Sequence, residues 1–194
     1  GHTVAAGDLG GNGDHDVFVS HLRSAAKNKV HVFLNPELSP NTSVTSSAAS
    51  QITASDSSHD FGATITSGAD VSGDGLHDLV VSNPTQTSGK AVYVFTAGQL
   101  TSGDLAASSA ATRIGTDGDY AAGESLALGD LNGDGVSDII IGAPGFGDEG
   151  AVFVFYGGAG LASAPDLQDA DIMIQGEKAG DAFGSQVQTL PDRG

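Results

Sequence analysis

Acidic and amide side chains recur in three short loops at the spacing that a hard cation needs. The most complete loop runs from Asp130 to Asp138, and similar loops run from residue 70 to 78 and from 8 to 16. The first aspartates of successive loops are 62 and 60 residues apart. Ca²⁺ takes six to eight oxygen ligands from carboxylates, amides and carbonyls. The spacing therefore predicts up to three Ca²⁺ sites, one in each repeat.

Each position of the loop has a predicted role. Positions 1, 3 and 5 aim side-chain oxygens at one point, position 7 gives its backbone carbonyl, and the carboxylate at position 9 completes the coordination. Gly10 gives the first loop no side chain at position 3, so water is expected there. The predicted ligands are Asp130, Asn132, Asp134, Val136 (carbonyl) and Asp138; Asp70, Ser72, Asp74, Leu76 (carbonyl) and Asp78; and Asp8, Asn12, Asp14 (carbonyl) and Asp16. We expect the third loop to bind most tightly and the first most weakly.

Other interpretations of these loops fit less well. An EF-hand closes with Glu at position 12 between helices, whereas here Asp138 closes at position 9 and a strand follows. Mg²⁺ prefers fewer protein oxygens and rigid octahedral geometry. A single such loop is also compatible with an Asx-rich turn that binds no metal. Three copies in the same phase favour the metal interpretation.

The period near 60 residues predicts a repeat architecture. Each period holds four short apolar or β-branched runs, which is typical of one blade of a β-propeller. The predicted strands are 2–6, 17–19, 30–34 and 51–53; 63–66, 79–81, 92–95 and 112–114; and 125–129, 139–141, 152–156 and 171–174. Segments 38–50 and 100–111 are expected to be surface loops. We interpret residues 1–194 as a single partial propeller with repeats at about 1–60, 61–121 and 122–182, and the start of a fourth at 183–194.

Motifs that flank the loops resemble the FG-GAP repeats of the integrin α-subunit propeller. Phe61-Gly62-Ala63 precedes the second loop, Phe183-Gly184-Ser185 precedes the start of the fourth repeat, and Gly142-Ala143-Pro144 follows the third loop. The third repeat departs from the pattern, with Gly123-Glu124 where Phe-Gly is expected. The resemblance implies an all-β, FG-GAP-type propeller with about three four-stranded blades of a seven-bladed ring, completed by further blades of the same chain. It also implies calcium loops on one face and partner binding on the opposite face.

Composition limits the possible partners. A net charge of −17 and a pI near 4.2 argue against nucleic acid and anionic membrane surfaces. No run of 18 apolar residues is present, so no membrane insertion is expected in this segment. The six histidines are scattered, and Asp117-Gly118-Asp119 is typical of a solvated turn rather than a catalytic dyad.

These features predict a non-enzymatic module. We expect an extracellular or cell-surface scaffold for adhesion, or for binding a protein or glycan, since millimolar calcium suits weak loop sites. The alternative is a non-catalytic propeller of a secreted hydrolase, because FG-GAP propellers also resemble appendages of phospholipases. Sequence beyond residue 194 would distinguish the two.

Overall fold

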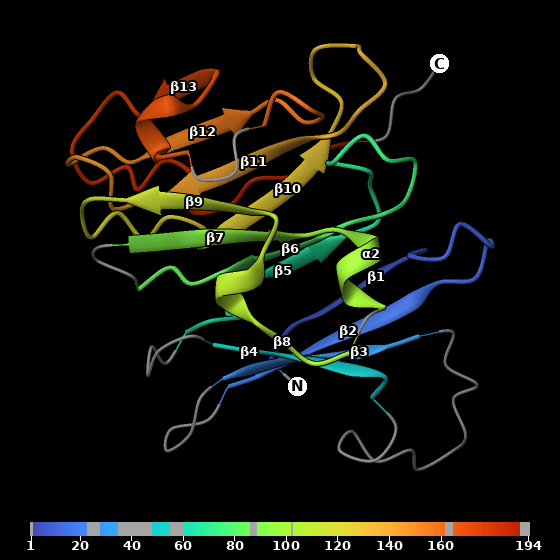
Figure 1. Cartoon of the computed structure of the whole chain (residues 1–194). Helices are drawn as coiled ribbons and strands as arrows, with labels where there is room; N and C mark the ends of the chain where they lie inside the picture. Colours follow the sequence, from blue (N-terminus) through green and yellow to red (C-terminus); the bar gives the residue numbers. More distant parts are fainter. Residues whose placement is uncertain are drawn as a thin grey trace.

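The computed structural model describes residues 2–22, 28–34, 48–54, 60–85, 89–101, 103–161 and 165–190, which form three antiparallel sheets stacked side by side (Figure 1). The first sheet contains β1 (Val4–Gly7), β2 (Asp16–His21), β3 (Lys29–Phe33) and β4 (Ser50–Thr53). The second contains β5 (Ile65–Ser67), β6 (Leu79–Ser82), β7 (Gly89–Phe95) and β9 (Thr112–Thr116). The third contains β10 (Ser125–Gly129), β11 (Asp138–Ala143), β12 (Ala151–Phe155) and β13 (Ile172–Gln175). The prediction of an all-β fold with four-stranded sheets is confirmed, and the sheets are stacked as the blades of a β-propeller are.

Side chains on the two faces of the middle sheet belong to different cores. Leu79 and Val81 of β6 pack in one apolar cluster with the first sheet, and Val80 packs in another with the third sheet. Consecutive apolar residues therefore suit this strand, because both of its faces are covered. All four residues of β6 and all six of β11 are buried. In β2 of the first sheet, buried and half-buried residues alternate, so one face of this strand is less completely covered.

Two apolar clusters hold neighbouring sheets together. The first lies between sheets one and two, and includes Phe18, Val30, Ile52, Phe61 and Phe95. The second lies between sheets two and three, and includes Val92, Ile114, Ile139, Ile141 and Phe153. A smaller third cluster on the far face of the third sheet contains Ala127, Ile140, Val152 and Val154. Among the described residues, the two larger clusters thus join each sheet to its neighbour, as in other repeat proteins.

The segment 100–111 is not the irregular surface loop that the sequence suggested. The helix α2 (Ala97–Leu100) ends at the first residue of this segment. The segment itself contains β8 (Leu105–Ala106) and the 3₁₀ helix η1 (Ala107–Ser109). β8 pairs in parallel with β4 of the first sheet, and Leu100 is buried. The prediction was wrong because this Ser/Ala-rich stretch covers the edge of the preceding sheet. Most of the other predicted loop, 38–50, lies outside the described residues. Residues 191–194 of the predicted fourth repeat also lie outside them.

The Phe-Gly position of the third repeat is also corrected. Gly62, Gly123 and Gly184 share a positive φ of 87°, 87° and 88°. The equivalent pair is therefore Ala122-Gly123 and not Gly123-Glu124. A Cβ on Gly123 would lie 2.7 Å from the Cβ of Ser82 in the preceding sheet. Glycine is needed there both for its left-handed conformation and for this close approach.

Candidate metal-binding loops

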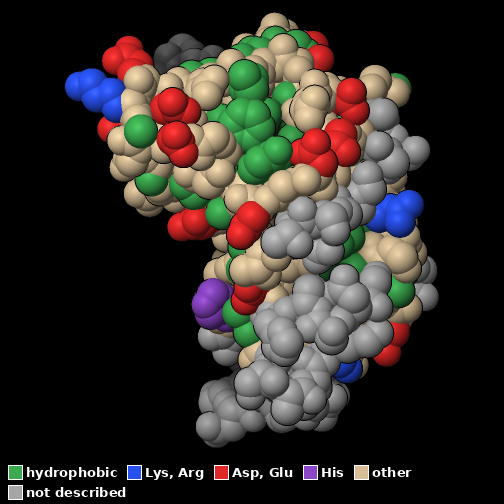
Figure 2. Space-filling model, turned by 90° about the vertical axis from the view of Figure 1, so that its left-hand side faces the viewer, with side chains coloured by type: hydrophobic (Ala, Val, Ile, Leu, Met, Phe, Trp, Pro, Cys, Tyr) green, Lys and Arg blue, Asp and Glu red, His purple; other side chains and the backbone are tan. Residues whose placement is uncertain are grey.

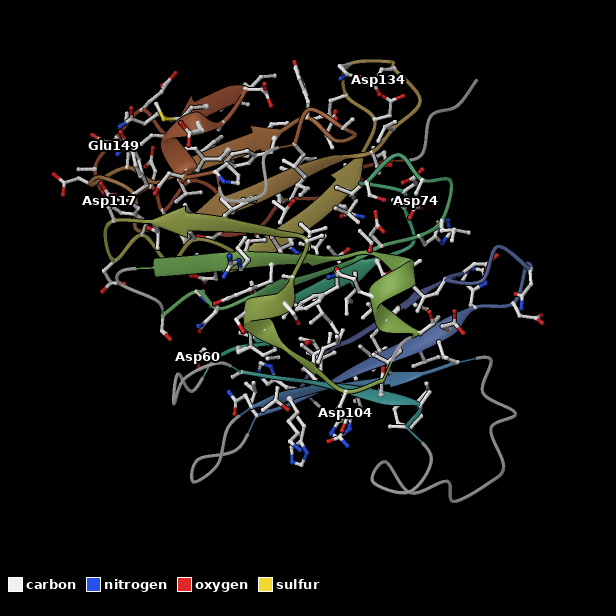
Figure 3. The ribbon with its side chains drawn as sticks, viewed as in Figure 1. Asp60, Asp74, Asp104, Asp117, Asp134 and Glu149 are labelled. Atoms are coloured by element: carbon white, nitrogen blue, oxygen red, sulfur yellow. The ribbon has the colours of Figure 1, made fainter. Side chains whose placement is uncertain are left out.

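The three acidic loops leave the same side of the stack, on the right in Figure 1. Each loop joins the first strand of a sheet to the second: β1 to β2, β5 to β6, and β10 to β11. Asp74 and Asp134, both at position 5, lie on this side in Figure 3, whereas Asp60, Asp117 and Glu149 lie on the opposite side. The repeat therefore places three equivalent acidic loops together at one face.

The aspartate at position 1 folds each loop around its carboxylate. In the third loop, Oδ1 of Asp130 accepts the N–H groups of Gly133 and Asp134 at 2.7 and 3.2 Å. Its Oδ2 accepts the N–H of Gly135 at 2.9 Å. Asp70 accepts the three equivalent N–H groups in the second loop. The loops thus share one backbone conformation.

Asp8 makes a similar set of contacts in the first loop. It accepts the N–H groups of Gly10, Asn12 and Gly13 at 3.1, 3.2 and 2.7 Å. The N–H of Gly13 is the main cause of the lowered pKa of Asp8, and the N–H of Gly135 is the main cause of the lowered pKa of Asp130. Hydrogen bonds to the ionised carboxylate favour the charged form. Both side chains therefore stay ionised, as a calcium ligand must.

The aspartate at position 9 closes the loop from inside the protein. Oδ2 of Asp16, Asp78 and Asp138 accepts the N–H of the position-2 residue at 2.9, 2.9 and 2.8 Å. All three carboxylates are buried. Burial is the main cause of the raised pKa of Asp78, although two N–H groups oppose it. The position-9 residues thus anchor the loops to the sheets.

The remaining predicted ligands face solvent or the loop backbone. In every loop the position-5 side chain accepts the N–H of position 7: Asn12 from Asp14, Asp74 from Leu76, and Asp134 from Val136. The position-3 residue varies. Asn132 donates to Asp134 at 2.9 Å, and the Ser72 hydroxyl instead turns toward Asp78 at 3.4 Å. The order of calcium affinity among the three loops stays a prediction.

The donor chemistry of these loops fits Ca²⁺. Carboxylate, amide and carbonyl oxygens are hard ligands, and an oxygen that accepts one N–H still has a second lone pair. Within the part of the chain that the structure describes, no three His, Cys, Asp or Glu side chains gather closely enough to hold a metal ion. Calcium binding by the residues predicted above therefore stays a prediction.

Successive loops are joined across the sheet interfaces. The carbonyl of Asp8 accepts the N–H of His77 at 3.3 Å, and that of Asp70 accepts the N–H of Ser137 at 2.8 Å. Asp8 also donates its own N–H to Nδ1 of His77 at 2.9 Å. His77 and Ser137 both occupy position 8. Sequence analysis assigned no role to His77 and missed its contact with the preceding loop, which no local pattern reveals.

Each of the three sheets carries an acidic loop between its first two strands. Comparisons with known proteins find a repeat of this kind in the chain. The FG-GAP repeat model matches residues 61–95 and 122–155. The chain is 37% identical over 119 residues to integrin alpha-7 from Homo sapiens, which covers 58% of this chain and 9% of the human protein. It is 36% identical over 118 residues to integrin alpha-7 from Rattus norvegicus, over 57% of this chain and 10% of the rat protein. The chain therefore contains FG-GAP repeats similar to those of integrin alpha-7, and it matches about a tenth of the length of these relatives.

None of the described helices is long and apolar enough to cross a membrane.

Proposed function

We propose that this chain is a calcium-binding β-propeller module that serves as an extracellular scaffold for adhesion, with a protein or a glycan as its ligand. The observation that carries the proposal is the repetition of one acidic loop at the same position of three adjacent sheets. Each loop holds an ionisable carboxylate at positions 1 and 9 and an oxygen-bearing side chain at position 5. Similarity to integrin alpha-7 supports the adhesive role.

In this proposal the cation stabilises the scaffold and the ligand binds elsewhere. Bound Ca²⁺ would neutralise carboxylates that repel each other at the loop face, in a chain whose net charge is −17. The opposite face carries Asp60, Asp117 and Glu149 (Figure 3), and we assign ligand contact to that face. Acidic side chains are spread over the surface in Figure 2, and few basic ones are visible. A ligand with basic or neutral hydrogen-bonding groups is therefore favoured.

Calorimetry on the whole chain tests the calcium assignment. Titration with Ca²⁺ should give binding heat, and Asp134→Ala should remove the contribution of the third loop. Asp119→Ala is the matched control, because Asp119 is an exposed acidic residue outside the acidic loops. Equal heats from the Asp134→Ala variant and the unmodified protein would refute the assignment. Screening of the calcium-loaded chain on a glycan array, and against extracellular matrix proteins, tests the ligand class.

A further inference from the structure

The second and third acidic loops contact each other at two consecutive residues. The N–H of Ser137, at position 8 of the third loop, donates to the carbonyl of Asp70, at position 1 of the second loop, at 2.8 Å. Val136, at position 7, lies 3.8 Å from the place where a Cβ on Gly73 of the second loop would stand. Both residues directly precede Asp138, the position-9 carboxylate. The closing half of the third loop therefore lies against the opening half of the second.

A two-residue segment after β12 connects the same loops a second time. The N–H of Gly157 donates to Oδ1 of Asp138 at 3.0 Å. The N–H of Gly158 donates to the carbonyl of Val71, at position 2 of the second loop, at 2.8 Å. Gly157 and Gly158 therefore form a backbone bridge from the closing carboxylate of the third loop to the second loop, and we call this segment the glycine bridge.

The two glycines of the bridge are needed for different reasons. A Cβ on Gly157 would lie 2.9 Å from the carbonyl oxygen of Val71 and 3.0 Å from a methyl group of Val136. Gly158 has a φ of +83°, which favours glycine, but a Cβ there would lie 3.9 Å from its nearest neighbour, Val136. Position 157 thus lacks space for a side chain, whereas position 158 has space and needs only the left-handed conformation.

The second repeat has a different structure at the equivalent position. Phe95 of β7 and Phe155 of β12 occupy the same place in the strand registers, so Ala97 is the equivalent of Gly157. Ala97 is the first residue of the helix α2 and belongs to the cluster between the first and second sheets. Within the described residues, a helix thus occupies this place at the first interface, and the glycine bridge distinguishes the second interface.

We propose that the second and third loops bind Ca²⁺ cooperatively through the glycine bridge, an inference that rests on the calcium-binding role proposed above. An ion in the third loop restricts Asp138, and the bridge passes this restriction to the backbone that follows Asp70. The second ion then meets a loop that has already lost part of its conformational freedom, so it binds more tightly. The coupling is reciprocal, because each ion must raise the affinity of the other loop by the same factor.

A calcium titration of the whole chain, followed by NMR, measures the two loops separately. The amides of Gly75 and Gly135, at position 6, each donate to the first aspartate of their own loop and therefore report its occupancy. Asp74→Ala removes a predicted ligand of the second loop and should weaken the calcium affinity reported by Gly135 by roughly fivefold or more. Asp134→Ala should weaken the affinity reported by Gly75 by the same factor. Asp119→Ala, outside the acidic loops, should change neither affinity.

Two variants of the bridge keep every carboxylate and test the connection itself. Gly158→Val should abolish the coupling, because a β-branched residue disfavours the left-handed conformation, and Gly158→Asn should keep it, because asparagine tolerates that conformation. Circular dichroism checks that both variants fold.

Three outcomes would contradict the inference, and they are distinguishable. If Gly75 and Gly135 both respond to calcium but Asp74→Ala leaves the affinity reported by Gly135 unchanged, cooperativity is refuted and calcium binding stands. This comparison holds even if Gly158→Val does not fold. Equal coupling in the two Gly158 variants would refute the role of the bridge. If neither amide responds to calcium, the proposed calcium-binding role fails, and this inference fails with it.

Discussion

The backbone carbonyl of Asp70 accepts a hydrogen bond from the N–H of Ser137 at 2.8 Å, so the first residue of one acidic loop holds the eighth residue of the next. Asp8 and His77 form the same contact between the first and second loops. The residue expected to ligate a cation through its side chain therefore fixes the neighbouring blade through its backbone. A cation that orders position 1 should accordingly stabilise an interface between blades as well as its own loop.

The contact between Asp8 and His77 should contribute measurably to stability. His77→Ala removes the acceptor of the Asp8 N–H, and we expect a loss of about 1 kcal/mol in the free energy of unfolding. His77→Asn should keep most of this stability, because its Oδ1 lies close to the position of Nδ1. Urea unfolding of the three proteins measures the difference. An equal loss in both variants would show that the hydrogen bond has no such role.

Loss of the carboxylate charge should affect the stability of the fold differently at Asp78 and at Asp130. Without calcium, Asp78→Asn should not destabilise the fold, because burial disfavours the Asp78 carboxylate and an amide oxygen still accepts the N–H of Val71. Asp130→Asn should destabilise it, because three N–H groups there favour the charged form. With calcium, both variants should lose the stability that the ion adds. Melting curves in EDTA and in calcium compare them. Destabilisation of both variants in EDTA would contradict this assignment.

The pH dependence of stability follows from the same two carboxylates. The raised pKa of Asp78 means that the folded state binds its proton more tightly, so stability falls as pH rises from 3.8 through the folded pKa. The lowered pKa of Asp130 contributes stability above 3.8 that is lost as pH falls through the folded pKa. In EDTA, the stability of the Asp78→Asn variant relative to the unmodified protein should therefore increase as pH rises above 3.8. Urea unfolding at several pH values above 3.8 measures it, and a constant difference would exclude the effect.

Most strands and the three acidic loops were predictable because their signals are local. Ser125–Gly129 was found where its pattern placed it, and continuous branched runs marked β6 and β11. Pairing of Leu105 with Ile52 was not predictable, because it joins two repeats and the covering residues are merely small. The Phe-Gly position of the third repeat was missed by one residue, since only the positive φ of Gly123 shows which residue makes the turn.

Removal of calcium should lower the melting temperature. An ion that binds only the folded state adds about 2.7 kcal/mol at one hundred times its Kd. Chelation with EDTA should remove this contribution and restore repulsion among the loop carboxylates. Magnesium should recover little of the lost stability, because its rigid octahedral shell suits these loops poorly. Calorimetric melting in calcium, magnesium and EDTA provides the comparison, and identical curves would count against structural calcium.

Phe146 of the third repeat makes an aromatic contact like that of the Phe-Gly phenylalanine of the second repeat. In the second repeat, Phe61 meets Tyr93 edge-on, with ring centroids 5.3 Å apart and planes at 78°. The third repeat has Ala122 at the position of Phe61, and Phe153 at that of Tyr93. Phe146 meets Phe153 in the same edge-on manner, at 5.1 Å and 81°. We therefore expect the Phe146 ring, which comes from the turn after β11, to fill the space that Ala122 leaves.

This compensation predicts strong coupling between the two positions. Phe146→Ala should lower the free energy of unfolding by roughly 2–3 kcal/mol, since the ring is half-buried. Ala122→Phe alone should cost about 1–3 kcal/mol, because the new ring competes with Phe146 for space. The double variant should be more stable than the sum of the single losses implies, by at least about 1 kcal/mol. Urea unfolding of the four proteins measures this coupling energy. Strictly additive losses would show that Phe146 and the Phe-Gly position fill separate spaces.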